Sequence, residues 1–197
     1  MKEKVPDLTQ RISARIRDLR AAQNLSLDAL ASRSGVSRSM ISFIERGESS
    51  PTAVVLEKLA AGLSVTLASL FNPPDSSNTP AGPISHRADQ LQWQDPASGY
   101  LRRNLTPPGL GQPMQLVEIH FPPGQRVAFE NVREQPVYQQ IWMLEGEMDI
   151  TKGKEAHRLQ AGDCLAMVLD RPHMFHNPTK KPARYLVVNS AEPAPNR

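Results

Sequence analysis

The sequence predicts an α + β protein of two domains, a helical one over residues 1–71 and an antiparallel β one over residues 84–197. Proline gives the first indication, because only Pro6 and Pro51 of the 18 prolines lie in the first 72 residues, and proline is poorly tolerated inside helices. Apolar residues at helical spacing fill the first third, whereas short alternating segments separated by turn signals fill the rest. The stretch between them, NPPDSSNTPAGP (residues 72–83), has almost nothing to bury and is predicted to be a linker.

Charge and cysteine content favour a cytoplasmic protein that binds nucleic acid. The net charge of +3 comes from residues 1–72, which carry 10 Lys+Arg against 7 Asp+Glu, whereas the remainder is balanced at 13 against 13. A surplus of positive charge on one domain suits contact with nucleic acid. The single cysteine, Cys164, excludes an internal disulfide, and no apolar run is long enough to cross a bilayer. We therefore expect a soluble cytoplasmic protein with no membrane partner.

Five short helices are expected in the first domain, each after the first preceded by a side chain that can accept a backbone hydrogen bond. Ser26 precedes LDALASRS, which Gly35 ends in a left-handed turn. Ser37 precedes RSMISFIERG, Thr52 precedes AVVLEKLAAGL, and Thr66 precedes a last short turn, LASLF. The first helix is indicated by apolar residues at helical spacing: Leu8, Ile12, Ile16 and Leu19. Two helices joined by a tight glycine turn, with flanking helices that close a core, make a helix-turn-helix.

The run LSLDALASRSGVSRSMISFIERGESSP resembles the helix-turn-helix family of phage repressors and their bacterial relatives, the Cro/C1 or XRE type. The resemblance covers residues 8–71 and implies a lambda-repressor-like bundle of five helices that binds double-stranded DNA. The sequence departs from the family at Leu27, where many relatives carry a glutamine that contacts phosphate. It departs again at Ser64, where a helix-ending glycine is usual, so the fourth helix is expected to end differently.

The third helix is expected to carry the DNA contacts, because an α-helix fits the major groove with its N-terminal residues nearest the base edges. Val36, Ile41 and Ile44 fall on one side and should anchor this helix to the core. Arg38 can donate a bidentate pair to guanine, and Phe43 can contact a thymine methyl group. The alternative for Phe43 is a position in the core or at a domain interface. The residues predicted to face DNA are Ser37, Arg38, Ser39, Ser42 and Phe43.

The resemblance also implies a structural ion pair between Arg20 and Glu45. In similar repressors, residues at these positions form a partly buried pair that ties the first helix to the third. We expect the pair to orient the recognition helix. The alternative is two separate surface charges.

The segment YQQIWMLEGEMDI…HRLQAGDCLAMVLDRPHMFHNPTKKPARYLVV resembles the cupin family, which implies an antiparallel β jelly roll. Aligning the first cupin motif on Gly146 places its glutamate at Gln139 and its two histidines at Val132 and Glu134. The second motif retains its histidine as His173. Because three of the four metal-ligand positions hold other residues, we expect no metal and no other cofactor; the alternative is a weak ion held by His173 and Glu134.

The interior of a small barrel can hold one small ligand. We therefore predict an effector pocket in which Glu134 reads a cationic or hydroxyl group. The alternative is a dry core in which His173 bonds a backbone carbonyl group. The residues predicted to line the pocket are Glu134, Gln139, Met143 and His173.

Three further predictions concern residues outside the pocket. Trp142 lies on the strand face opposite Gln139, because side chains alternate along a strand, and is expected to anchor domain or dimer packing or, equally, to lie in the barrel core. Cys164 is expected to be a buried, inert thiol. The remaining scattered histidines are expected to be surface or structural residues: His86, His120 and His157.

A helix-turn-helix joined to a cupin resembles a family of bacterial transcriptional regulators. The resemblance implies a homodimer that binds a pseudo-palindromic DNA operator and responds to an unidentified small-molecule effector. Two alternatives remain open. One is a metal-dependent cupin oxidoreductase, since an oxidative epoxidase has a similar layout, and the other is a regulator whose cupin serves only as a dimerisation scaffold.

Overall fold

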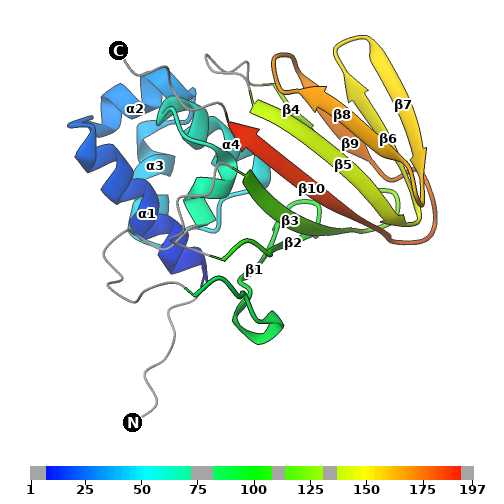
Figure 1. Cartoon of the computed structure of the whole chain (residues 1–197). Helices are drawn as coiled ribbons and strands as arrows, with labels where there is room; N and C mark the ends of the chain where they lie inside the picture. Colours follow the sequence, from blue (N-terminus) through cyan, green and yellow to red (C-terminus); the bar gives the residue numbers. More distant parts are fainter. Residues whose placement is uncertain (1–7, 72–81, 108–113, 131–136, 192–197) are drawn as a thin grey trace, which may run out of the picture. The chain divides into compact units, whose positions relative to one another are not determined.

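The computed structural model describes residues 8–71, 82–107, 114–130 and 137–191. The chain divides into two compact units, Met1–Ala81 and Gly82–Arg197 (Figure 1). The first unit is helical and the second is built of β-strands, which confirms the predicted α + β class.

The helical unit contains four α-helices and a 3-10 helix. The α-helices are α1 (Leu8–Ala22), α2 (Leu27–Ser34), α3 (Arg38–Glu45) and α4 (Ala53–Gly62), and the 3-10 helix is η1 (Leu67–Phe71). The expected bundle of five α-helices was therefore wrong in its last member. Five residues make little more than one turn, and short helical pieces of this kind commonly adopt the tighter 3-10 geometry.

Local hydrogen bonds explain where these helices begin and end. Ser26 accepts a hydrogen bond from the backbone N–H of Ala29, and Gly35 ends α2 with a φ of 67°, in the left-handed region. Ser37 and Thr52 cap α3 and α4 in the same way. The helices close over a core of fully buried apolar side chains: Ile12, Ile16, Leu30, Ile41, Ile44, Leu56 and Leu59.

Helix α4 ends in a left-handed residue although position 64 is a serine and not a glycine. Ser64 has a φ of 54°, so a serine adopts the left-handed conformation that glycine takes in many helix ends. Its backbone N–H donates to the carbonyl oxygen of Ala61 at 3.0 Å, and the N–H of Val65 donates to Ala60 at 2.9 Å. The helix therefore ends in a regular hydrogen-bonded cap at the energetic cost of a side chain in the left-handed region.

Replacing Ser64 by glycine is expected to stabilise the protein by about 0.5–1 kcal/mol, because glycine adopts this conformation without steric strain. Chemical denaturation of the full chain, followed by circular dichroism at a helical wavelength, would measure the change. Ser64→Ala is the control, since alanine retains the Cβ atom and loses the hydroxyl group. An equal gain from both variants would show that the backbone at position 64 is not strained.

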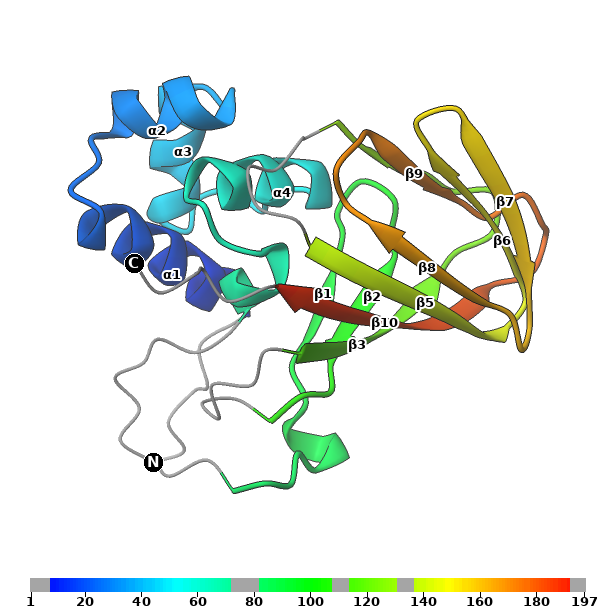
Figure 2. The ribbon, with the colours of Figure 1, turned by 45° about the horizontal axis from the view of Figure 1, so that its top comes forward.

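The second unit consists of two antiparallel sheets. One sheet has the strand order β1-β2-β3-β10-β5-β8 and the other β4-β9-β6-β7, and the strands form two layers in Figure 2. The strands are β1 (Gln92–Gln94), β2 (Leu101–Asn104), β3 (Met114–Phe121), β4 (Arg126–Phe129), β5 (Val137–Glu145), β6 (Glu147–Lys152), β7 (Glu155–Gln160), β8 (Cys164–Val168), β9 (His173–His176) and β10 (Ala183–Ala191). A short 3-10 helix, η2 (Arg87–Asp89), precedes them.

The inner faces of the two sheets meet in an aromatic core. The ring of Tyr185 on β10 lies parallel to that of Phe175 on β9, with their centroids 6.2 Å apart. Burial raises the pKa of the Tyr185 phenol well above its usual value. Gly146 makes the turn between β5 and β6 at a φ of 77°, where an added Cβ atom would lie 2.8 Å from the Pro182 carbonyl oxygen. This close approach explains why the turn requires glycine.

Candidate functional site

Helix α3 has one buried side and one exposed side. Ile41 and Ile44 are fully buried and hold the helix to the core. On the other side, Phe43 is 46% exposed, so the alternative that placed its ring in the core was wrong. The remaining predicted contact residues are also accessible: Ser37, Arg38 and Ser39 are exposed and Ser42 is half-buried.

The N-terminus of α3 is polar, and its contacts are weak. The Arg38 guanidinium Nε lies 3.3 Å from a carboxylate oxygen of Asp28, and both side chains are largely exposed to solvent. Such a pair adds little stability and is readily exchanged for another acceptor. Ser37 accepts a 3.3 Å hydrogen bond from the backbone N–H of Met40, and its hydroxyl lies 3.3 Å from that of Ser39. Neither contact prevents these side chains from donating to an incoming anion.

Two residues of this surface were missed by the sequence analysis. The guanidinium carbon of Arg46 lies 5.1 Å above the centre of the Phe43 ring, within the range of a cation–π contact. Arg46 also makes two 2.7 Å hydrogen bonds to Glu48, which lower the pKa of that carboxyl group, and a further bond to Ser42. Met40 is 40% exposed. Helical spacing could have identified both, because Met40 and Arg46 lie three residues on either side of Phe43.

Arg20 and Glu45 form a bidentate ion pair between α1 and α3. The guanidinium donates to the two carboxylate oxygens at 2.6 and 2.7 Å, and a third N–H donates to the backbone carbonyl of Leu25 at 2.8 Å. Only 18% of the Arg20 side chain and 8% of the Glu45 side chain are exposed. The hydrogen bonds that Arg20 donates to Glu45 raise the pKa of Arg20 further. The alternative of two separate surface charges was therefore wrong.

Two of the four residues predicted to line the barrel interior lie on β5, and their side chains point inward. Gln139 is 7% exposed and Met143 is 1% exposed, and they alternate with exposed residues along the strand. Glu134, the fourth predicted pocket residue, and Val132 lie outside the described residues.

His173 makes the contact that the dry-core alternative anticipated, a 3.2 Å hydrogen bond between its Nδ1 atom and the carbonyl oxygen of Arg171. Its ring stacks on Phe129 with a centroid separation of 5.1 Å and meets the edge of Phe175 at 5.9 Å. His173 is therefore held in a fixed orientation by an aromatic environment, with 7% of its surface exposed.

The position of His173 along the barrel follows from its neighbours on β9. Asn177 donates to the carbonyl oxygen of Phe121, whose register partner on β10 is Ala183. Two residues earlier, Phe175 stacks on Tyr185. A further step of two residues along both strands extrapolates to His173 opposite Val187. This is near the end of β10 where Asn189 is the register partner of Gln139.

Within the described ranges, no three His, Cys, Asp or Glu side chains come together in a group that could hold a metal ion. His176 faces away from His173 on β9 and lies 3.7 Å from Asp149. In place of the cupin glutamate, Gln139 offers a neutral amide, a poor ligand for iron or manganese.

An inward-facing arginine was not anticipated. Arg102 is 5% exposed and pairs across the sheet with Ile119, on the inner face of β3. The sequence contained the signal, because Arg102 and Arg103 are adjacent in a strand and must point to opposite faces. Arg103 takes the outer face, where it forms an ion pair with Glu118.

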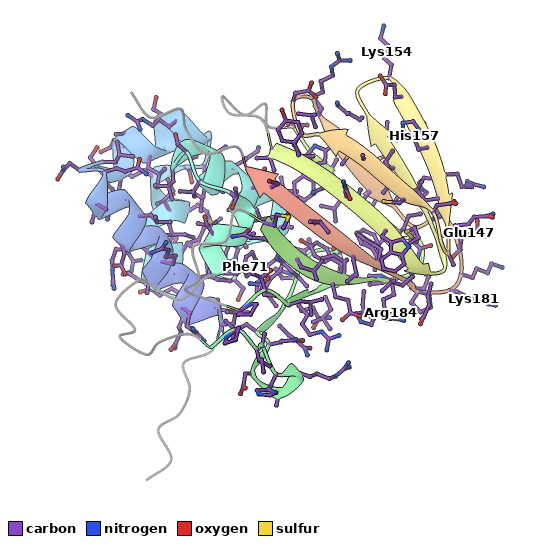
Figure 3. The ribbon with its side chains drawn as sticks, in the orientation of Figure 1. Phe71, Glu147, Lys154, His157, Lys181 and Arg184 are labelled. Atoms are coloured by element: carbon purple, nitrogen blue, oxygen red, sulfur yellow. The ribbon has the colours of Figure 1, made fainter. Side chains whose placement is uncertain are left out.

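The outer face of the six-stranded sheet corrects two expectations. Trp142 is 49% exposed, so the alternative role in the barrel core was wrong. Its register partner on β8 is Cys164, which is exposed rather than buried. Both results follow from alternation, since Trp142 faces away from Gln139 and its partner must share that face. The three scattered histidines are exposed, as expected: His86, His120 and His157, of which His157 on β7 is labelled in Figure 3.

Comparison with known proteins supports both units. Residues 16–70 match the helix-turn-helix model and residues 117–189 match the cupin domain model. HTH-type transcriptional regulator SutR of Escherichia coli (strain K12) is 26% identical over 87% of this chain and 89% of its own length. Uncharacterized HTH-type transcriptional regulator y4dJ of Sinorhizobium fredii is 33% identical over 76 residues, which are 39% of this chain and 96% of that protein.

The chain belongs to the HTH-type transcriptional regulators. The crystal structure of an HTH_3 family transcriptional regulator from Vibrio cholerae matches 93% of this regulator and 96% of that chain, with a TM-score of 0.73 and 27% identity. The resemblance to XRE-type regulators with a cupin domain is thereby confirmed. In the described part of the regulator, no helix is long and apolar enough to span a membrane.

Proposed function

We propose that this regulator recognises a specific DNA sequence through α3 and that its cupin domain senses a small molecule. The observation that carries the first part is the division of α3 into a buried apolar side and an exposed side. The exposed side presents hydrogen-bond donors at the N-terminus of the helix and apolar groups in its middle, in the order of Arg38, Met40 and Phe43. Such a helix suits the major groove, where guanine accepts two hydrogen bonds and thymine offers a methyl group.

Selection from a pool of random DNA duplexes tests this proposal directly. The purified full-length regulator is expected to enrich a pseudo-palindromic sequence whose half-sites lie about one helical turn apart, because a dimer presents two recognition helices. Failure to enrich any sequence, with binding that depends only on salt concentration, would contradict sequence-specific recognition.

A homodimer formed by the cupin domain is part of the proposal. The outer face of the six-stranded sheet exposes large apolar side chains, with Met114 at 55%, Tyr138 at 44% and Trp142 at 49% exposed. Leu186 pairs with Trp142 across β10 and β5, and Val188 lies on the same face two residues along. A contiguous apolar face bordered by the ion pairs of Glu118 is typical of a protein–protein interface.

Replacing Trp142 by glutamate is expected to weaken the dimer at least thirtyfold, since buried tryptophans at the centre of an interface are worth about 2 kcal/mol or more. Sedimentation over a range of concentrations would measure the dissociation constant. His157→Glu is the control, because His157 is exposed on β7 of the other sheet. Equal dimerisation by both variants would place the interface elsewhere.

The sensing part of the proposal rests on the inward residues Gln139, Met143 and His173, with Glu134 as a fourth member that lies outside the described residues. Burying polar groups in an apolar interior costs free energy, so a domain that served only as a scaffold would be expected to carry apolar residues at these positions.

A thermal-shift screen of metabolites against the full chain would identify stabilising ligands. His173→Ala is expected to abolish the shift and leave operator binding unchanged. A purified protein that contained near-stoichiometric iron and oxidised a substrate would overturn the proposal in favour of an enzyme.

A further inference from the structure

Three side-chain amides lie in a row on three adjacent strands of the six-stranded sheet, near one end of each strand. Gln115 on β3 is the register partner of Asn189 on β10, and Asn189 is the register partner of Gln139 on β5. All three face the interior of the barrel, because they alternate in phase with buried residues of their strands, such as Val117. Adjacent strands are about 4.8 Å apart, so the three amides are neighbours although they are far apart in the sequence. We call this set the amide row.

The hydrogen bonds of the amide row are incomplete. Gln139 donates from Nε2 to the Oδ1 atom of Asn189 at 2.9 Å. The Oε1 atoms of Gln139 and Gln115 are both buried and accept no hydrogen bond from the described residues. Gln139 as a whole is 7% exposed, so its acceptor is directed into the interior. A buried acceptor without a donor is costly, and most buried polar groups in folded proteins are satisfied.

The surroundings of the amide row define what can satisfy these two acceptors. The next register partner of Gln139 is Met167 on β8, so the row ends in an apolar side chain. The row carries no charge, and Arg102, an inward cation on β2, pairs with Ile119, four residues along β3 from Gln115. A ligand carboxylate offers only acceptors, so it could not donate a hydrogen bond to the Oε1 atoms of Gln115 and Gln139. An ammonium group would lose its hydration without a counter-charge in the row.

We propose that the amide row binds hydroxyl or amide N–H groups of a neutral small molecule. The two free carbonyl oxygens accept hydrogen bonds from the ligand, and the aromatic rings around His173 on the facing sheet cover its apolar part. This inference rests on the proposal that the cupin domain senses an effector, and it assigns the chemical class of that effector: a neutral donor rather than an organic acid.

The test uses three small probes of similar size: propanamide, 1,2-propanediol and propionate. Side-chain amide groups of glutamine and asparagine give their own signals in nitrogen–proton NMR spectra of the labelled full-length protein. Propanamide and propanediol are expected to shift the signals of Gln139 and Asn189 in a saturable manner, and propionate is expected to leave them unchanged. Gln139→Leu is expected to weaken binding of the neutral probes roughly tenfold, because it removes one acceptor and the donor to Asn189.

Gln160→Leu is the matched control, because Gln160 is exposed on β7 of the other sheet. It should bind the neutral probes as the parent protein does.

Three outcomes would overturn the inference. Propionate could bind as well as the neutral probes, the shifts could be confined to the rings of Phe175 and His173, or the two leucine variants could have equal effects. Shifts confined to those rings would still support a ligand site in the barrel, so failure of the inference is distinguishable from failure of the proposed sensing function. If no probe shifted any inward-facing signal, the inference would fall, and the metabolite screen with His173→Ala would decide separately whether the barrel senses anything.

Discussion

Replacing Glu45 by alanine is expected to lower the free energy of unfolding of the helical unit by about 3 kcal/mol. The substitution leaves the Arg20 guanidinium without the two hydrogen bonds of 2.6 and 2.7 Å that it makes to the carboxylate. Removing one partner of a buried ion pair costs about 3–5 kcal/mol, and the lower end applies because 18% of the Arg20 side chain is exposed. Since small domains are stable by only about 5–15 kcal/mol, this change would be large.

The matched control for Glu45→Ala is Glu48→Ala. Glu48 makes two 2.7 Å hydrogen bonds to Arg46, so the geometry is equivalent, but both side chains are about half exposed. Water replaces an exposed pair at little cost, and the control should change the unfolding midpoint much less. Urea denaturation of the full chain would compare the two variants. If both destabilised the protein equally, burial would not be the reason for the strength of the Arg20–Glu45 pair.

Replacing Arg38 by alanine is expected to reduce discrimination between the selected operator and unrelated DNA by roughly 5- to 150-fold. A bidentate contact between arginine and guanine is worth about 1–3 kcal/mol of discrimination, and 1.4 kcal/mol corresponds to a factor of ten. The stability of the free protein should hardly change, because the ion pair of Arg38 with Asp28 is largely exposed. Fluorescence anisotropy with operator and scrambled duplexes at one salt concentration would measure both affinities.

Arg17→Ala is the control for Arg38→Ala, since it removes the same charge. Arg17 lies on α1 and forms a comparably exposed pair with Asp18, at 3.8 Å. It is expected to weaken binding to both duplexes to a similar, small extent. If Arg38→Ala retained the discrimination of the parent protein, the N-terminus of α3 would not be directed at the base edges, and the proposed docking of the helix would be wrong.

Several features of the fold could be predicted because the interactions that decide them are local. A helix cap joins residues three apart, so Ser26, Ser37 and Thr52 marked the starts of their helices correctly. The cupin motif could be aligned on Gly146 for a similar reason, because the turn at this residue requires a positive φ, which glycine adopts without strain. Alternation along a strand is equally local, and it placed Gln139 and Met143 on the inner face of β5.

Other predictions failed, or stayed open between two alternatives, because nearby residues do not decide them. Alternation placed Trp142 on the face opposite Gln139, but whether another layer covered that face was a tertiary question, and 49% of Trp142 is exposed. The burial expected for Cys164 failed for the same reason, since this residue shares the face of Trp142. The 3-10 geometry of η1 (Leu67–Phe71) shows that a capping residue specifies a turn but not the type of helix.

By itself, the sequence determined the class of each domain and the position of the helix-turn-helix, because each depends on residue identity and short spacing. Only the tertiary structure revealed the amide row, since Gln115, Gln139 and Asn189 become neighbours through the register of three strands. Strand register is decided by the packing of a whole sheet against its partner, and a shift of one residue would turn all three amides to the opposite face. The same packing decides which polar atoms lack a protein partner.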